Sequence, residues 1–171
     1  MTISIYKNVA DTVGANVDLF TVLTTNKWQH LTEKVRAETN KAKRDKLKQQ
    51  LLPAFTPSGV FKENNRTDAG LVKHSGYMCI DIDGDDNPTI KDWQSVVFEL
   101  GKLPQIAFAG LSASGNGVFA IIPIKYPDKH KEHFEAFQKS FAKRGLIIDP
   151  KCKNVSRLRF YSYNKHYYIN K

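Results

Sequence analysis

The chain has 171 residues, of which 41% are hydrophobic and 11% aromatic, enough to bury the core of one domain with or without a small helical appendage. Lys and Arg outnumber Asp and Glu by 26 to 17, and the net charge of +9 favours a polyanionic partner. No apolar run approaches the roughly 20 residues of a membrane span, the N-terminus has no secretory pattern, and the two cysteines have no metal-ligand spacing. We therefore expect a cytoplasmic protein with no membrane partner.

Residues 1–70 are expected to form an N-terminal, mainly helical unit packed on the core. Ile3 and Ile5 alternate with polar residues, as in a short strand. Residues 27–52 carry spaced apolar side chains among many charges, which predicts one helix that stops before Pro53. Residues 54–70 are rich in Pro, Gly and Asn, a composition typical of a loop.

Residues 71–171 predict the core, and we expect both parts to form one compact domain. The expected elements are a buried strand at 77–83, a helix at 89–100 with a capping signature at Thr89 and Asp92, a strand at 105–111, a turn at 112–117, a strand at 118–124, a helix at 128–145, and strand-like segments at 146–149 and 157–163. Up to residue 149 the order is strand, helix, strand, strand, helix, strand. This order predicts an α+β fold with an RRM-like βαββαβ antiparallel sheet and helices on one face.

Four carboxylates follow the apolar strand, at Asp81, Asp83, Asp85 and Asp86, and no Lys or Arg lies within residues 74–90. Like charges at contact distance repel, so a divalent cation is the expected partner. Asp81 and Asp83 lie one strand step apart and point to the same face, which lets the pair ligate Mg²⁺ or Mn²⁺. The plainer interpretation is an acidic turn at the end of a strand.

Two other acidic motifs fit the sequence less well. In an EF-hand loop, Asp86 would stand where Gly belongs and Asp92 where the bidentate Glu belongs. A phosphatase of the haloacid dehalogenase type is a closer rival, but it has Thr where this chain has Asp85. That fold also needs parallel strand–helix repeats, which the predicted order lacks.

Further candidate residues follow the acidic strand. Residues 112–117 contain two serines and two glycines, which permit close backbone approach to phosphates but also make ordinary hairpin turns. Asp149 ends the strand predicted to neighbour 77–83, where it could complete a metal site. Arg157, Arg159 and Tyr161 alternate with apolar residues, so their side chains share one face suited to phosphate contact and base stacking.

Basic residues gather toward both ends of the chain. Residues 150–171 hold six basic residues and no acid, and residues 34–48 hold seven basic residues and two acids. This distribution suits a polyanion held over a central metal site, although a run of charges is also typical of a solvated helix face.

These motifs occur in an order that resembles the archaeo-eukaryotic primase (primase-polymerase) superfamily. The resemblance is carried by residues 79–83 (CIDID), 112–117 (SASGNG), 148–149 (ID) and 156–160 (SRLRF). Upstream, residues 52–61 (LPAFTPSGVF) resemble the primase-like N-terminal domain of virulence-associated protein E-type proteins of Bacteroidetes and their mobile elements. The similarity runs from about residue 43 to 170.

The resemblance implies nucleotidyl transfer with two divalent ions, Mg²⁺ or Mn²⁺, in replication of a mobile element or phage. Its implied partners are nucleoside triphosphates, single-stranded DNA or a primer-template, and a helicase domain or protein. The implied catalytic and metal-binding residues are Asp81, Asp83 and Asp149. The implied nucleotide-binding residues are Ser112, Ser114, Gly115, Asn116, Gly117 and Arg157, and those for nucleic acid are Lys151, Lys153, Arg159 and Tyr161.

One residue departs from the superfamily's pattern. Active members usually place His two residues after the second Gly of the loop, where this chain has Phe119, which cannot donate a hydrogen bond to phosphate. The departure leaves open a catalytically weak or inactive single-stranded nucleic-acid-binding module on the same fold. A third alternative is a phosphohydrolase with Asp81 as its nucleophile.

Overall fold

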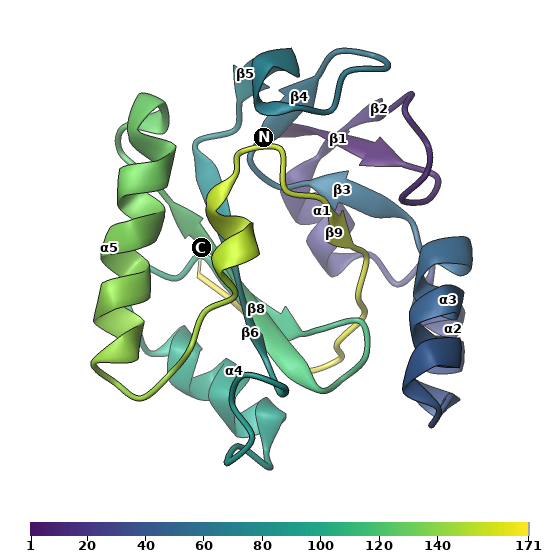
Figure 1. Ribbon diagram of the computed structural model, residues 1–171, viewed down its shortest axis with the longest axis vertical. Helices are drawn as coiled ribbons and strands as arrows, with labels where there is room; N and C mark the ends of the chain where they lie inside the picture. The colour runs from purple at the N-terminus through teal and green to yellow at the C-terminus, as the bar shows by residue number, and fades with distance from the viewer. Residues whose placement is uncertain (171) are drawn as a thin grey trace.

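The centre of the fold is an antiparallel sheet with the strand order β10-β7-β8-β6. These strands are β6 (Tyr77–Asp83), β7 (Phe108–Leu111), β8 (Gly117–Pro123) and β10 (Tyr168–Ile169) in a computed structural model that describes residues 1–170. Strands β6 and β8 cross the middle of the molecule (Figure 1). Helices α4 (Trp93–Gly101) and α5 (His130–Ala142) cover one face of this sheet. The expected α+β fold is confirmed.

Alternation along β6 explains why the sheet has two different faces. Met78, Ile80 and Ile82 are fully buried in the core that α4 and α5 share with the sheet. Side chains in a strand alternate between faces, so Asp81 and Asp83 point to the opposite side. The strand predicted at 77–83 has these bounds in the structure.

The predicted βαββαβ order holds from β6 through α5, but its last strand is wrong. Residues 146–149 form no strand, although they run beside β6 and the Asp149 N–H donates to the Asp81 carbonyl at 2.9 Å. Pro150 follows at once and has no N–H to donate, so a ladder does not continue. The C-terminal strand β10 instead extends the opposite edge, beside β7.

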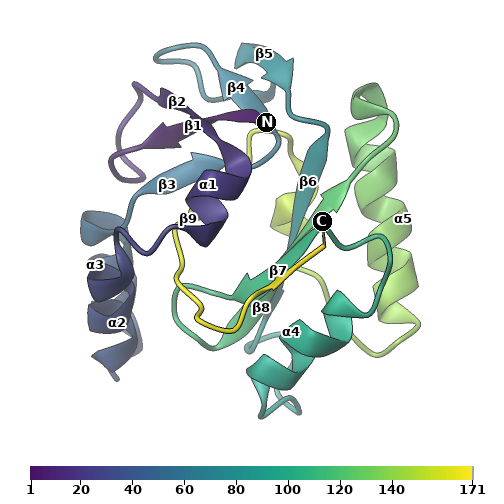
Figure 2. The same cartoon turned by 180° about the vertical axis from the view of Figure 1, so that it is seen from behind.

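A second sheet, ordered β2-β1-β3-β9, joins strands of the N-terminal unit to β9 from the C-terminal part of the chain (Figure 2). Its strands are β1 (Thr2–Tyr6), β2 (Ala15–Asp18), β3 (Ala54–Thr56) and β9 (Arg159–Phe160), and a separate hairpin pairs β4 (Gly59–Phe61) with β5 (Leu71–His74). The loop predicted at 54–70 therefore contains two strands. The strand-like segment predicted at 157–163 keeps two residues as β9, which pairs with β3.

The single helix predicted over 27–52 is two helices, α2 (Gln29–Ala37) and α3 (Lys41–Leu51), and a short α1 (Leu19–Thr24) precedes them. The break occurs at Asn40, whose side-chain oxygen accepts a hydrogen bond from the Lys43 N–H at 3.1 Å and so caps a new helix. The capping residue of α4 is likewise Asp92, not Thr89. Short 3₁₀ turns lie at η1 (Asp68–Gly70), η2 (Pro127–Lys129) and η3 (Pro150–Lys153).

The N-terminal unit packs on the face of the central sheet that α4 and α5 leave uncovered. A second apolar core fills the interface. Leu19 and Phe55 come from the N-terminal unit, and Phe119 and Ile121 come from β8. This core stops short of the end of β6 that bears Asp81 and Asp83, which is where the molecule stays open. Within residues 1–170, no helix combines the length and apolar character required to cross a bilayer.

Gly101 allows the end of the chain to dock on α4. A Cβ atom on Gly101 would lie 2.5 Å from ring atoms of Tyr168, so we expect Gly101→Ala to push β10 away from β7. Overpacking of this kind costs about 1–3 kcal/mol, partly offset by about 1 kcal/mol of helix propensity. Urea unfolding measures the loss. Glu99→Ala, on the exposed side of α4, is the control, and equal stability of the two variants would contradict the prediction.

Candidate functional site

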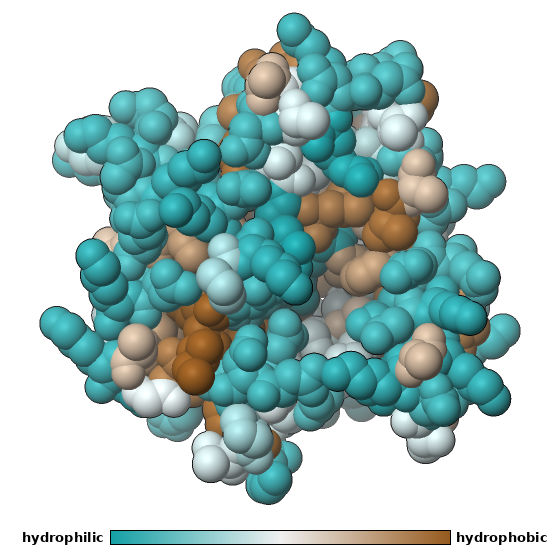
Figure 3. Space-filling view, viewed as in Figure 1, coloured by the Kyte–Doolittle hydropathy of each residue, from teal (hydrophilic) through white to brown (hydrophobic). Residues whose placement is uncertain are grey.

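An open cleft lies between α3 and the ends of β6 and β8, where Figure 3 shows the molecule hollowed. It consists of two adjoining hollows of about 390 and 360 Å³ that share four residues: Lys48, Asp83, Ser114 and Arg157. The cleft therefore gathers groups from the acidic strand, the serine–glycine loop, the C-terminal segment and α3.

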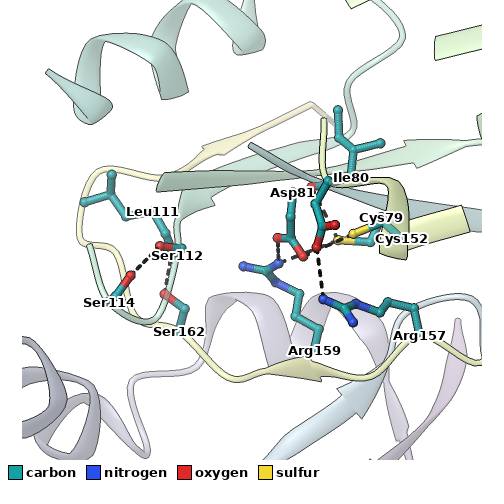
Figure 4. A network of polar contacts seen from close by, with 11 residues as sticks. Cys79, Ile80, Asp81, Leu111, Ser112, Ser114, Cys152, Arg157, Arg159 and Ser162 are labelled. Atoms are coloured by element: carbon teal, nitrogen blue, oxygen red, sulfur yellow. Dashed lines mark hydrogen bonds and ion pairs between the residues drawn. The ribbon is translucent and has the colours of Figure 1, made fainter. Parts of the chain in front are cut away.

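Asp81 lies at the inner end of the cleft and is bonded through both carboxylate oxygens (Figure 4). The Arg159 Nη1 donates to Oδ1, and the Cys152 thiol donates to Oδ2 at 3.3 Å. The Arg159 guanidinium lies 3.5 Å from the centroid of the Phe119 ring. Burial is the largest single influence and lowers the pKa of Arg159, but the Asp81 carboxylate, with smaller contributions from Cys79 and Cys152, raises it above its usual value.

Among Asp81, Asp83 and Asp149, Asp83 is the residue whose carboxylate accepts no hydrogen bond from residues 1–170. It lines both hollows. Burial, and then the nearby Asp81 carboxylate, raise the pKa of Asp83 above its usual value, with smaller contributions from Asp149 and Asp86. Removal from water is thus the main effect that disfavours the charged form of Asp83, and the nearby Arg159 guanidinium opposes it. A cation bound at Asp83 would stabilise that charged form.

Asp149 stands next to β6, as the sequence predicted. Its backbone binds Asp81, its Oδ1 accepts from the Lys151 N–H at 2.9 Å, and its Oδ2 lies 3.2 Å from the Arg157 Nη2. The Asp149 side chain is therefore fixed both as the cap of η3 and as one half of an ion pair.

The serine–glycine loop lines the cleft together with Asp149. Ser112 and Ser114 hydroxyls lie 3.2 Å apart, and Gly115 has a φ of 76°, which favours glycine. The Asn116 carbonyl accepts from the Gly84 N–H, and Gly117 pairs with Asp83 in the ladder. The loop is thereby fixed to the acidic turn.

Arg36 on α2 also holds this loop, and the sequence had not singled it out. Its Nη2 donates to the Ser112 carbonyl at 2.9 Å and lies 3.3 Å from the Ser162 Oγ. The two partners lie far from Arg36 in the sequence, so no local pattern could have revealed this role.

The residues predicted to bind nucleic acid are separated by the fold. Lys151 lines the cleft, and Lys153 forms an ion pair with Glu135 on α5 at 2.9 Å. Tyr161 is only 1% exposed, and its hydroxyl donates to the Thr25 carbonyl at 2.6 Å. Tyr161 is therefore a core residue here, and base stacking on its ring is not possible in this conformation.

Three cations from α3 line the cleft: Lys41, Arg44 and Lys48. Lys41 reaches Asp85 at 2.5 Å across the opening, between two exposed side chains. The basic run at 34–48 was the available signal, but sequence alone left it open whether this run faces solvent or a ligand.

The side chains of the cleft meet the needs of the expected pair of divalent ions only in part. Carboxylates are the ligands that Mg²⁺ and Mn²⁺ prefer, so the donor set fits in kind. Among residues 1–170, however, no three Asp, Glu, His or Cys residues form a group ready to hold a metal ion. Asp81 and Asp149 are paired with arginines, which leaves Asp83 as the free ligand.

The geometry gives no support to the phosphohydrolase alternative. Both Asp81 oxygens accept hydrogen bonds, one of them from the buried Arg159 guanidinium, and this pairing weakens Asp81 as a nucleophile. The central sheet is antiparallel, whereas that alternative requires parallel strand–helix repeats.

Comparison with known proteins gave one match. Residues 46–168, well over half of the chain, match the family described as "BT4734-like, N-terminal domain". No curated protein and no solved structure matched the chain.

Proposed function

The chain belongs to the BT4734-like N-terminal domain family, and we propose that it is a metal-dependent nucleotidyltransferase domain of primase-polymerase type. One observation carries the proposal. Asp81, Asp83 and Asp149 meet the serine–glycine loop in one cleft whose opposite wall is basic. Such a cleft is suited to a phosphate chain held close to carboxylates.

The chain's own groups would bind and orient the phosphates. The hydroxyls of Ser112 and Ser114 supply short-range hydrogen bonds, and the cations of α3 and Lys151 attract the polyanion. Arg157 is more than a third exposed and can turn from Asp149 to a phosphate oxygen. A divalent cation held by Asp83 and Asp149 would neutralise charge on the transferred phosphoryl group and lower the pKa of the attacking hydroxyl.

The resemblance to the primase superfamily supports the proposal despite Phe119. The Arg159 guanidinium stacks on the Phe119 ring, so a cation stands beside the position where the superfamily usually has His. We include in the proposal single-stranded DNA or a primer-template, nucleoside triphosphates and a helicase as partners, cytoplasmic localisation, and a role in replicating a mobile element or phage.

Replacing Asp83 tests the proposal. We expect Asp83→Asn to reduce incorporation of labelled nucleotides on single-stranded DNA with Mn²⁺ by about 100-fold or more, because several kcal/mol of charge stabilisation depend on a bound cation. Asp86→Asn makes the same charge change in the same turn, outside the cleft lining, and should leave incorporation unchanged. No incorporation by the wild type, or full incorporation by Asp83→Asn, would refute the function.

A second candidate is a single-stranded nucleic-acid-binding module that needs no metal. The observation that favours it is the neutralisation of Asp81 and Asp149 by arginines. This function requires that the oligonucleotide still binds when EDTA removes divalent cations. The logarithm of the binding constant should fall with the logarithm of the salt concentration, with a slope of about −0.7 for each phosphate contact. Binding that is insensitive to salt would exclude it.

A further inference from the structure

Two aspartate–arginine pairs stand side by side in the cleft and differ in their access to solvent. In the first pair, the side chains of Arg159 and Asp81 are 6% and 15% exposed. In the second, those of Arg157 and Asp149 are 37% and 12% exposed. The arginine of the second pair can leave its partner for water or a ligand, and the arginine of the first cannot.

Both oxygens of Asp81 already accept a hydrogen bond, and its arginine partner is too buried to move aside for a cation. Arg159 occupies one oxygen and the Cys152 thiol the other. Burial raises the pKa of Cys152, so the thiol keeps its proton and remains a donor. A metal ion that displaced Arg159 would leave a buried guanidinium without its counter-ion, which is strongly unfavourable.

Arg159 keeps donors that the protein does not use. Its Nη1 donates to Asp81 and lies 3.9 Å from the Cys79 Sγ. Its Nε is buried without a partner, and its Nη2, which has no acceptor among residues 1–170, is the donor left for a ligand. The residue is 7% exposed and lines the same hollow as Ser112 and Ser114. Stacking on Phe119 fixes the plane of the guanidinium, and a fixed planar guanidinium is well matched to phosphate oxygens.

We propose that Arg159 is a phosphate-binding residue of the cleft and that Asp81 is the positioning residue that holds it there. Asp81 is then not a metal ligand, and cation binding is left to Asp83 and Asp149. This inference rests on the function proposed above but changes the assignment of Asp81. The phosphate belongs either to a polyphosphate chain or to a nucleic-acid backbone.

Two charge-neutral double variants separate the roles of the pairs. Asp81→Asn/Arg159→Gln and Asp149→Asn/Arg157→Gln each remove one positive and one negative charge. We would measure Mn²⁺ binding by electron paramagnetic resonance and binding of inorganic triphosphate and of a single-stranded oligonucleotide by calorimetry. These readouts do not depend on nucleotidyl transfer, so failure of the inference and failure of the proposed function are distinguishable.

The first double variant should bind Mn²⁺ within about threefold of wild type and lose about tenfold or more in affinity for triphosphate or for the oligonucleotide. The ligand that weakens identifies the source of the phosphate. The second should lose Mn²⁺ binding. The inference is overturned if the first variant loses Mn²⁺ as the second does, or if it binds both phosphate ligands as wild type does.

A milder variant covers the case in which the first double variant does not fold. Arg159→Lys keeps the charge but loses the planar fork. It should weaken phosphate binding without changing the affinity for Mn²⁺, and unchanged phosphate binding by Arg159→Lys would also overturn the inference.

Discussion

Arg159→Met is expected to cost about 3–5 kcal/mol of folding free energy, because it leaves the Asp81 carboxylate buried without its charge partner. It also removes the cation–π contact with Phe119. For a domain of this size the loss corresponds to a fall of roughly 6–20 °C in Tm. Differential scanning calorimetry of wild type and variant measures it.

Arg157→Met is the matched control, two residues away in the same segment. Asp149 is as buried as Asp81, but it keeps the hydrogen bond from the Lys151 N–H, and the Arg157 guanidinium is already partly solvated. We therefore expect Arg157→Met to lose clearly less stability than Arg159→Met. The double variant Asp81→Asn/Arg159→Gln should recover much of the stability lost by Arg159→Met, because neither charge is then buried alone. Equal losses for the two single arginine variants would contradict the prediction.

The second large expected effect is a loss of stability in acid that arises at His130. His130 is 6% exposed, and its Nδ1 lies 3.1 Å from the Nε2 of His74. The Gly76 N–H donates to the His74 Nδ1 at 2.9 Å. The His74 proton therefore sits on Nε2 and is donated to His130, which must accept through an unprotonated Nδ1. Protonation of His130 breaks this chain of hydrogen bonds.

Burial, and then the neighbouring His74, lower the pKa of His130 from 6.5 to about 4 in the folded protein. Between these values the unfolded chain binds more protons than the folded one, so stability falls as pH falls from 6.5 to about 4. The full loss is about 3 kcal/mol. Asp68, Lys131 and His133 also act on His130, with smaller effects.

Urea unfolding at pH 7 and pH 5 tests this expectation. His130→Gln keeps an acceptor for His74 but does not titrate, so its stability should depend less on pH than that of wild type. His30→Gln, at an exposed position of α2, should keep the wild-type dependence. The assignment to His130 fails if wild type and His130→Gln lose equal stability on acidification.

Local patterns in the sequence determined the α+β fold, the order of elements from β6 to α5 and the bounds of β6. Alternation along a strand and spacing along a helix each depend on near neighbours, so a single sequence carries them. The same alternation placed Asp81 and Asp83 on one face, and the structure confirms that placement.

The tertiary structure alone decided which partners these carboxylates have. Strands β9 and β10 are two residues long, too short to show a period, and β9 pairs with a strand about a hundred residues away. That pairing brings Arg159 onto Asp81, while Asp83 stays free in the cleft. The sequence supplies the charges, but burial and long-range pairing decide which of them is neutralised, because both depend on contacts that no local pattern encodes.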